Sequence, residues 1–470
     1  MATSYLTKVF GGDSNLDKWT LSMWVKRGTV DSTVAIYGTY INGSNYELIT
    51  FTSGGVLYWE NYQSSSMKSK LETKRLFRDP AAWYHLVFVW DSANASAGDR
   101  ARIYVNGVEE TEWETDTQPS SGQDSLIGNT YTQQIGANGS GNNDYDGCMS
   151  HIHFCDGYAY AASDFGSFDS TSGIWKINTG PSVSYGTNGY FILNNSASVT
   201  DDSPNSNNWT IYEYITSTKD SPSNNFATLN VLDRHIRDTN NSGDFVQGKN
   251  GNLTLDSSSG MWAAVRSTLG VTAGKWYWEL KRVSGTADLT GICYGNWFWN
   301  ATGNQPWDNA YYQCADFSVN GGTGYYSWSG RSGDSSWLSS VTATTGDILG
   351  YALDMDNSAL YVHHNGTYFD GVGGTPGVPT SGATKTGDML GLLDATNGVK
   401  YVNYGQEVFP VFADVETSNT AKIEVNFGNG YFGQTQITSA GTNAGEGLFE
   451  YDVPTGYYAL CTKNLKLQGG

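Results

Sequence analysis

The stretch WTLSMWVK at residues 19–26 alternates large apolar side chains with small or polar ones in its first half. A repeat of two is typical of a β-strand that buries one face. The stretch WYHLVFVW at residues 83–90 has strand length but is apolar on both faces, so we expect both faces to be covered. Residues 101–108 contain Asn106-Gly107, a pair that favours a type I′ hairpin turn. These stretches predict antiparallel strands.

The composition of the whole chain agrees with strands. Of 470 residues, 57 are Gly, while Trp, Tyr and Phe number 16, 31 and 18, and only 15% are charged. Many aromatic residues and turn formers with few charges are typical of strands joined by short polar loops. No long segment combines helical periodicity with helix-forming residues. We predict an all-β protein of two antiparallel β-sandwich (jelly-roll) domains with a short C-terminal extension.

The chain is acidic, with 46 Asp and Glu against 26 Lys and Arg and a net charge of −20. This charge disfavours nucleic acids and acidic membranes, because affinity for phosphates comes largely from Lys and Arg. It is compatible with calcium and with neutral or cationic glycans. Acidity often does no more than keep a protein in solution, so it does not choose among these ligands.

Three features of the chain bear on its location. The start shows no secretory signal peptide, and the strongest apolar run is too short to span a bilayer. The cysteines are too few and too scattered for a disulfide framework: Cys148, Cys155, Cys293, Cys314 and Cys461. We expect a soluble protein that is made in a cytoplasm and does not insert into membranes.

A change in composition divides the chain. Residues 194–225 are dominated by Asn, Ser, Thr and Asp, which is typical of a linker, although Trp209, Ile211 and Tyr212 indicate a strand or packed segment inside it. Strand patterns restart at 275–283 and continue at 347–366 and 421–427. We therefore predict a first domain over 1–195, a linker over 196–225, a second sandwich over 226–430 and an extension over 431–470.

The first domain resembles the laminin-G/concanavalin-A-like superfamily. The resemblance is carried by residues 19–26, 83–91, 102–107 and 135–136 leading to 145–147, in that order and spacing. It implies a jelly roll of two antiparallel sheets.

The second domain resembles a SPRY domain, and this match is the stronger of the two. Its signature pieces are residues 274–279, 291–293, 346–350, 353–356, 365–366, 409–412 and 425–428. The resemblance implies another sandwich, in a family that binds partners through its loops.

The order of the modules is similar to that in structural proteins of tailed bacteriophages, often marine ones. The resemblance extends to the Asn/Asp/Ser-rich linker between the two domains. It also extends to residues 453–465, which are similar to the segment that follows SPRY-like domains in that group. The resemblance implies a virion location, other virion proteins as partners and a homo-oligomer. No virion-anchoring domain or coiled-coil stalk is obvious in the sequence, which weighs against a full-length tail fibre.

Catalysis is not expected, although the lectin-like superfamily includes glucanases. Glycosidases of this fold need carboxylates at fixed spacing on one strand. The nearest acidic cluster, EETEWE at residues 109–114, follows a hairpin turn and lacks that order, so a solvated strand face explains it better. We predict a non-enzymatic protein.

Two groups of residues are candidate metal ligands. Asp144 and Asp146, beside a Gly/Asn-rich loop, could bind calcium through carboxylate and carbonyl oxygens. Residues 148–155 contain the pattern C-x2-H-x-H-x-C, whose residue types suit zinc. Neighbouring ligands on one strand rarely converge on one ion without a second strand, so a polar strand face is the better interpretation. No metal is certain, and calcium is the possible cofactor.

The aromatic-rich stretch 294–337 holds the candidate ligand-binding residues. Aromatic faces beside amides and carboxylates suit sugar rings and also protein interfaces. The better surface candidates are Trp297, Trp299, Trp307, Tyr311 and Tyr326. One hypothesis is a tail-fibre or appendage adhesin whose sandwich loops bind host surface polysaccharide. The alternative is a capsid or tail decoration protein whose loops bind other virion proteins.

Overall fold

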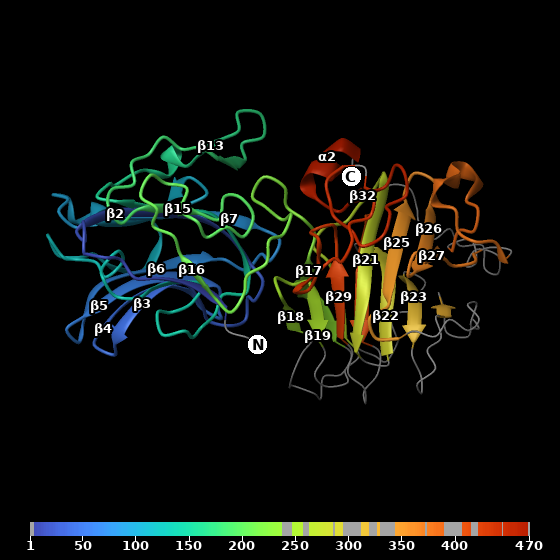
Figure 1. The fold of residues 1–470 in the computed structure, drawn as a ribbon, viewed down its shortest axis with the longest axis horizontal. Helices are drawn as coiled ribbons and strands as arrows, with labels where there is room; N and C mark the ends of the chain where they lie inside the picture. Colours follow the sequence, from blue (N-terminus) through green and yellow to red (C-terminus); the bar gives the residue numbers. More distant parts are fainter. Residues whose placement is uncertain are drawn as a thin grey trace. The chain divides into compact units, whose positions relative to one another are not determined.

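The computed structural model describes residues 4–236, 247–256, 263–284, 287–294, 312–318, 327–329, 344–371, 374–389, 407–414, 422–443 and 445–468. The chain divides into two compact units, residues 1–217 with 221–223 and residues 218–220 with 224–470. Each unit consists mainly of antiparallel sheets (Figure 1), which confirms the predicted all-β class. None of the helices in the described ranges is long and apolar enough to cross a membrane.

The first unit contains two large antiparallel sheets. The eight-stranded sheet has the order β10 (Trp113–Thr117), β6 (Ser66–Leu76), β5 (Val56–Gln63), β4 (Asn45–Phe51), β3 (Val34–Asn42), β11 (Gln133–Ile135), β1 (Tyr5–Lys8) and β16 (Thr210–Tyr212). The six-stranded sheet has the order β15 (Tyr190–Ile192), β12 (Gly147–Asp156), β2 (Lys18–Arg27), β7 (Trp83–Asp91), β8 (Ala101–Val105) and β9 (Val108–Glu109). A short 3-10 helix, η1 (Ala97–Asp99), precedes β8.

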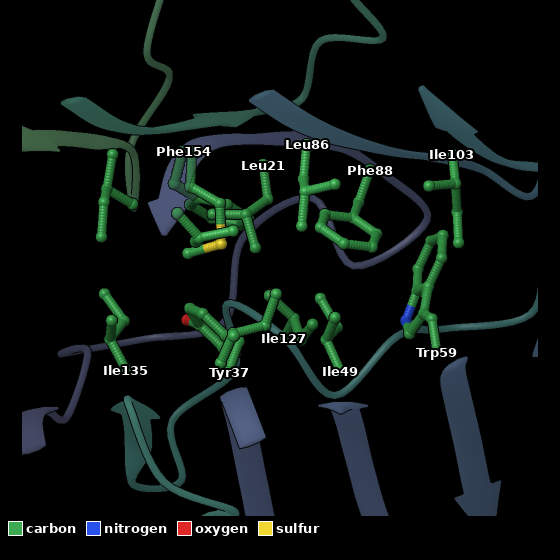
Figure 2. Packing of buried hydrophobic residues seen from close by; sticks show 14 of the residues in the cluster. Leu21, Tyr37, Ile49, Trp59, Leu86, Phe88, Ile103, Ile127, Ile135 and Phe154 are labelled. Carbon is green, nitrogen blue, oxygen red and sulfur yellow. The ribbon is translucent and has the colours of Figure 1, made fainter. Parts of the chain in front are cut away.

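The core of the first unit lies between these two sheets. Figure 2 shows the buried side chains facing one another across the gap: Leu21, Leu86, Phe88, Ile103 and Phe154 on one side, and Tyr37, Ile49, Trp59, Ile127 and Ile135 on the other. All of them are almost fully buried. Each large apolar side chain buried in this way stabilises the fold by ~1.5–3 kcal/mol.

The six-stranded sheet is covered on its outer face as well. Residues 157–189, with η2 (Ala162–Asp164), β13 (Gly166–Phe168) and β14 (Trp175–Ile177), lie across the side away from the eight-stranded sheet (Figure 1). This confirms the expectation that both faces of residues 83–90 are covered.

The interpretation of residues 19–26 as a half-buried strand is wrong, because β2 is buried on both faces. The small polar side chains of β2 bind the covering segment or the neighbouring strand β7 instead of water. Thr20 Oγ1 donates a hydrogen bond to the carbonyl oxygen of Tyr158 at 2.8 Å, and Ser22 Oγ lies 2.9 Å from His85 Nε2.

The predicted turn at Asn106-Gly107 and a second Asn-Gly pair, Asn365-Gly366, both form hairpin turns. Asn106 and Gly107 have φ of 48° and 83° between β8 and β9, and Asn365 and Gly366 have φ of 48° and 87° between β26 (Ala359–His364) and β27 (Thr367–Tyr368). Positive φ at both positions is the geometry of a type I′ turn. At Gly107 a Cβ would lie 2.2 Å from the Trp175 ring, so glycine is also required for space.

Part of the polar stretch 196–225 belongs to the first unit. Trp209 is buried in the core, 5.0 Å from the Tyr190 ring and 6.3 Å from the Tyr37 ring, and the next residues form β16, which pairs with β1. The strand indicated by the aromatic residues is therefore present. The structure assigns residues up to 217 to this unit, where the sequence indicated a linker from 196.

The second unit also contains two large antiparallel sheets. The six-stranded sheet has the order β17 (Leu229–Ile236), β20 (Ala263–Ser267), β28 (Val408–Asp414), β22 (Ala287–Tyr294), β23 (Tyr312–Ser318) and β24 (Ser327–Ser329). The eight-stranded sheet has the order β18 (Gln247–Lys249), β19 (Thr254–Asp256), β29 (Lys422–Asn426), β21 (Lys275–Ser284), β25 (Ile348–Asp354), β26 and β27, with β32 (Tyr458–Ala459) parallel to β21.

The C-terminal residues are built into the second unit. Trp276 and Trp278 of β21 face the core, and Tyr277 between them packs on the opposite face against Phe449 and Tyr457. The segment also contains β30 (Tyr431–Phe432), β31 (Thr435–Gln436) and α2 (Thr462–Gln468), while η4 (Pro379–Thr384) lies between β27 and β28 in sequence. Residues 431–468, which the sequence indicated as an extension, thus cover one face of a sheet (Figure 1).

Candidate functional site

The outer face of the eight-stranded sheet in the first unit carries a row of tyrosines. Successive side chains of a strand point to opposite faces, so the residues that alternate with the core positions of β3, β4 and β5 point away from the core. Tyr40 pairs with Tyr46 and Tyr46 pairs with Tyr62 across these three strands. We call these three residues, together with Tyr58, the tyrosine face.

The rings of the tyrosine face form a ladder across the strands. The ring centroids of Tyr40 and Tyr46 lie 6.3 Å apart and those of Tyr46 and Tyr62 lie 5.1 Å apart, with nearly parallel planes. Tyr40 is 41% exposed, while Tyr46 and Tyr62 are half-buried. The ladder therefore offers aromatic surface to a ligand on a rigid sheet, where it is fixed by backbone pairing.

Charged side chains lie beside the ladder on the same face. Leu48 of β4 pairs with Glu60 of β5, which pairs with Lys70 of β6, and in the next row Tyr58 pairs with Glu72. Lys70 Nζ lies 3.0 Å from Glu72 Oε2 and 5.3 Å from the centroid of the Tyr58 ring. The face thus combines aromatic rings, carboxylates and ammonium groups.

Partial burial changes the acidity of these groups. Burial raises the pKa of Glu60, the Lys70 ammonium opposes this change, and the Glu72 carboxylate adds to it. Burial also raises the pKa of Tyr46 and of Tyr58. Both phenols therefore remain protonated at neutral pH and can donate hydrogen bonds.

A polar loop, residues 138–142, crosses the same face over β3. A Cβ at Gly38 would lie 2.6 Å from the carbonyl carbon of Asn138, so only glycine allows this close approach. Gly141 N donates to Gln134 Oε1 at 3.0 Å and holds the loop on the sheet. Beyond the loop, the rings of Tyr5 and Tyr212 stack at 4.5 Å. Two aromatic groups therefore flank one polar loop.

The buried acid Glu47 belongs to the other side of this sheet. It is fully buried and accepts hydrogen bonds from Trp59 Nε1 and Asn61 Nδ2 at 2.9 Å, Ser125 Oγ at 2.8 Å and Leu126 N at 2.6 Å. Burial raises the pKa of Glu47, while these donors oppose the change. Because Glu47 points away from the tyrosine face, its role is to hold the loop around residue 125 to the sheet.

The predicted calcium ligands lie at the end of the polar loop. Asp146 Oδ2 accepts a hydrogen bond from Thr29 Oγ1 at 3.0 Å, and the Asp146 carbonyl oxygen accepts one from Gly28 N at 2.8 Å. Within the described ranges, no three or more His, Cys, Asp or Glu residues form a group that could hold a metal ion. A calcium ion at Asp144 and Asp146 would therefore need carbonyl or water oxygens as further ligands, and this site stays a prediction.

The residues of the C-x2-H-x-H-x-C pattern have structural surroundings. His153 Nδ1 lies 2.9 Å from Tyr185 Oη, and its ring stacks on Phe191 at 3.9 Å. His151 lies at a bulge of β12 with φ of 48°, out of register with His153. Cys155 is buried in the cluster that covers the six-stranded sheet. The pattern lies on a strand as expected, but His153 and Cys155 are buried against other side chains and do not form an exposed polar face.

The predicted ligand-binding aromatics of the second unit cannot be placed. Trp297, Trp299, Trp307, Tyr311 and Tyr326 all lie outside the described residues. Their role as a binding site stays a prediction.

Sequence reasoning missed the tyrosine face, although the sequence held a signal for it. The segment VLYWENYQ at residues 56–63 places Tyr58, Glu60 and Tyr62 at alternating positions, and NYELITF at residues 45–51 adds Tyr46. That alternation predicts tyrosines on one face of a strand. Their alignment across three strands follows only from the register of pairing.

Comparison with known proteins gives a family for part of the first unit. Residues 4–162 match the model of the concanavalin A-like lectin/glucanases superfamily, which is less than half of the chain. A search of curated proteins finds no match.

Solved structures similar to parts of the chain have low sequence identity. The SPRY domain of human HERC1 is 16% identical over 37% of this chain and 87% of that chain, with a TM-score of 0.24. Domain 4 of an extracellular arabinanase from Geobacillus stearothermophilus, in complex with arabinotriose, is 15% identical over 32% of this chain and 65% of that one, with a TM-score of 0.23. A heptameric SAP-like pentraxin from Limulus polyphemus is 16% identical over 38% and 88%, with a TM-score of 0.27. At such scores these structures do not indicate the function of this chain.

Proposed function

We propose that the first unit binds carbohydrate on the tyrosine face, and that the chain is a non-catalytic surface protein of a bacteriophage particle that attaches to host surface glycans. The observation that carries the proposal is the ladder of Tyr40, Tyr46 and Tyr62 beside charged hydrogen-bonding groups. It lies within the residues that match the lectin/glucanases superfamily model.

The chemistry of the face suits a sugar. The C–H faces of a sugar ring are apolar and pack against aromatic rings, while its hydroxyl groups need donors and acceptors. Here the rings come from the tyrosine face, and the hydrogen-bonding groups are the carboxylates of Glu60 and Glu72 and the ammonium of Lys70.

The arrangement of the acids supports binding over hydrolysis. A glycosidase needs one protonated acid and one free carboxylate on either side of the bond that breaks. Glu72 is held by Lys70 at 3.0 Å and accepts a hydrogen bond from Thr115 Oγ1 at 3.3 Å. Both contacts are made within the protein, so Glu72 is not left free to attack a sugar or to activate water.

The virion location rests on the order of modules in the sequence. A laminin-G-like module, a polar bridge, a SPRY-like module and the segment 453–465 together resemble structural proteins of tailed phages. A tail fibre or another appendage, assembled from identical chains, is the role that fits a glycan-binding face.

The test is binding of the purified chain to a glycan array and to host cells, with and without calcium. We expect saturable binding that the double variant Tyr46→Ala, Tyr62→Ala weakens by about tenfold or more, since each aromatic contact contributes ~1 kcal/mol. Thermal unfolding of each variant checks that it is folded.

A second double variant, Trp297→Ala, Trp307→Ala, separates the two candidate sites. Binding lost only in this variant would place the site in the second unit and contradict the tyrosine face. No binding by the folded native chain would contradict glycan recognition and favour a decoration protein of the capsid or tail. Loss of binding without calcium in the native chain would support ligands at Asp144 and Asp146.

A further inference from the structure

We infer that the glycan bound on the tyrosine face carries a protonated amine, as an unacetylated amino sugar does, and that Glu60 receives this amine. The inference rests on the proposed function and adds the chemical class of the ligand. It is drawn from the surroundings of one carboxylate.

Glu60 is surrounded by aromatic rings on its own side of the sheet. Tyr58 and Tyr62 lie two positions before and after it on β5, so both side chains point to the same face. Tyr46 lies diagonally across on β4, because it pairs with Tyr62 while Leu48 pairs with Glu60. A carboxylate among three tyrosines joins the two features that favour an organic cation, a negative charge and aromatic faces.

The protein's own Lys70 shows this recognition within the chain. Its ammonium lies 5.3 Å from the centroid of the Tyr58 ring and 3.0 Å from Glu72 Oε2. An amine is thus already held here by one tyrosine and one carboxylate. One row away on the same face, the carboxylate of Glu60 and the rings of Tyr46 and Tyr62 again bring a carboxylate and tyrosines together.

Glu60 is the carboxylate left for a ligand. Among the residues that the structure describes, the Glu60 carboxylate makes no hydrogen bond and no ion pair. Glu72, in contrast, forms an ion pair with Lys70 and accepts a hydrogen bond from Thr115. Lysines alternate with the buried positions of β6, and of these Lys70 pairs with Glu72 and Lys74 with Glu112, while no ion pair to Glu60 is found among the described residues. A half-buried carboxylate without an ion pair binds a cation more strongly than a fully hydrated one.

The Glu60 carboxylate also disfavours acidic ligands. Uronic acids and sulfated sugars would bring a second negative charge next to Glu60. Since like charges at close range repel, we expect acidic glycans to bind worse than neutral ones.

The test compares tetramers of glucosamine, N-acetylglucosamine and glucose with the same linkage, by calorimetric titration at about pH 6, where an amino sugar is protonated. We expect the glucosamine tetramer to bind the native chain about tenfold more tightly than the glucose tetramer. The ratio of the two affinities should fall to about one in Glu60→Gln. The matched control Asp99→Asn removes the same charge from the exposed helix η1 and should keep the native ratio.

A second variant tests the inference from the other direction. Lys70→Gln removes the ammonium that pairs with Glu72 and lies opposite Glu60 on the next strand, so the preference for the glucosamine tetramer should increase several-fold. The inference is overturned if the ratio of the affinities for the glucosamine and glucose tetramers is unchanged in Glu60→Gln. It is also overturned if the native chain binds the three tetramers equally. Neither result contradicts glycan binding itself. Binding of none of the tetramers overturns the inference as well, while the array with Tyr46→Ala, Tyr62→Ala decides separately on glycan binding.

Discussion

Glu279 of β21 connects two parts of the second unit that are far apart in sequence. It is fully buried, and its carboxylate accepts hydrogen bonds from Glu450 N and Tyr451 N at 2.8 Å and from Tyr277 Oη at 3.1 Å. One side chain therefore holds the C-terminal segment on the sheet. Burial raises the pKa of Glu279 to about 7, although these donors lower it.

This raised pKa predicts a pH dependence of stability. The pKa in the folded state lies above the ordinary value of 4.5, so the contribution of Glu279 is fully present below about pH 4.5 and is lost as the pH rises through about 7. We expect the free energy of unfolding of the second unit to fall by about 3 kcal/mol over this range. Urea unfolding at a series of pH values measures it.

The control for this prediction is Glu279→Gln, which cannot ionise. Its stability should vary less with pH than that of the native chain over the same range. Parallel pH profiles of the two proteins would assign the dependence to other groups.

At the scale of elements, the eight-stranded sheet of the first unit carries two aromatic groups on one face. The ladder on β3, β4 and β5 lies on one side of the loop 138–142, and the stacked pair Tyr5 and Tyr212 lies on the other. Five strand spacings separate β5 from β16, which corresponds to ~24 Å. Only a long chain of sugars would cover the ladder from β5 and also reach Tyr212 on β16.

The separation of the two groups predicts a dependence on ligand length. Tyr212→Ala should weaken binding of long oligosaccharides several-fold and leave binding of short ones unchanged, because only long ligands reach beyond the loop. A titration with oligosaccharides of increasing length measures this effect. If Tyr212→Ala weakens short and long ligands equally, the pair is not a separate part of the site.

Strands and hairpin turns could be predicted because their signals are local. Alternation in residues 19–24 and the two Asn-Gly pairs involve only neighbouring positions. The burial of both faces of β2 could not be predicted in this way, because the residues that cover it, 157–189, follow more than a hundred positions later in the sequence. The tyrosine face was missed for a related reason, since the register that aligns Tyr40, Tyr46 and Tyr62 is set by packing of the whole sheet.

At the scale of the molecule, each unit is completed by residues from beyond its sequence-predicted boundary. The first unit uses Trp209 and β16 from the polar stretch, and the second uses Phe449 and Tyr457 from the C-terminal residues. Composition alone assigned these segments to a linker and an extension because they are rich in polar residues and Gly. Their few aromatic side chains decide where they pack.

The boundary of the first unit predicts how fragments behave. Residues 1–223 should fold alone and keep the proposed glycan binding, since they contain the complete unit. Residues 1–195 lack Trp209 and β16 and should be less stable by at least ~3 kcal/mol, the usual cost of losing a large buried aromatic side chain. Urea unfolding of both fragments checks this, and equal stability would contradict it.

The pairing of β1 with β16 has a mechanical consequence. Tyr5 is opposite Tyr212 and Thr7 is opposite Thr210, so the chain enters and leaves this ladder at the same end. Tension between the two ends of the unit would load the hydrogen bonds one after another, like a zipper, and not all together in shear. The Tyr5–Tyr212 stack would part first, and β16 would peel from the sheet at low force. A pull on the unit would then lengthen the chain before the core of the unit carries the load.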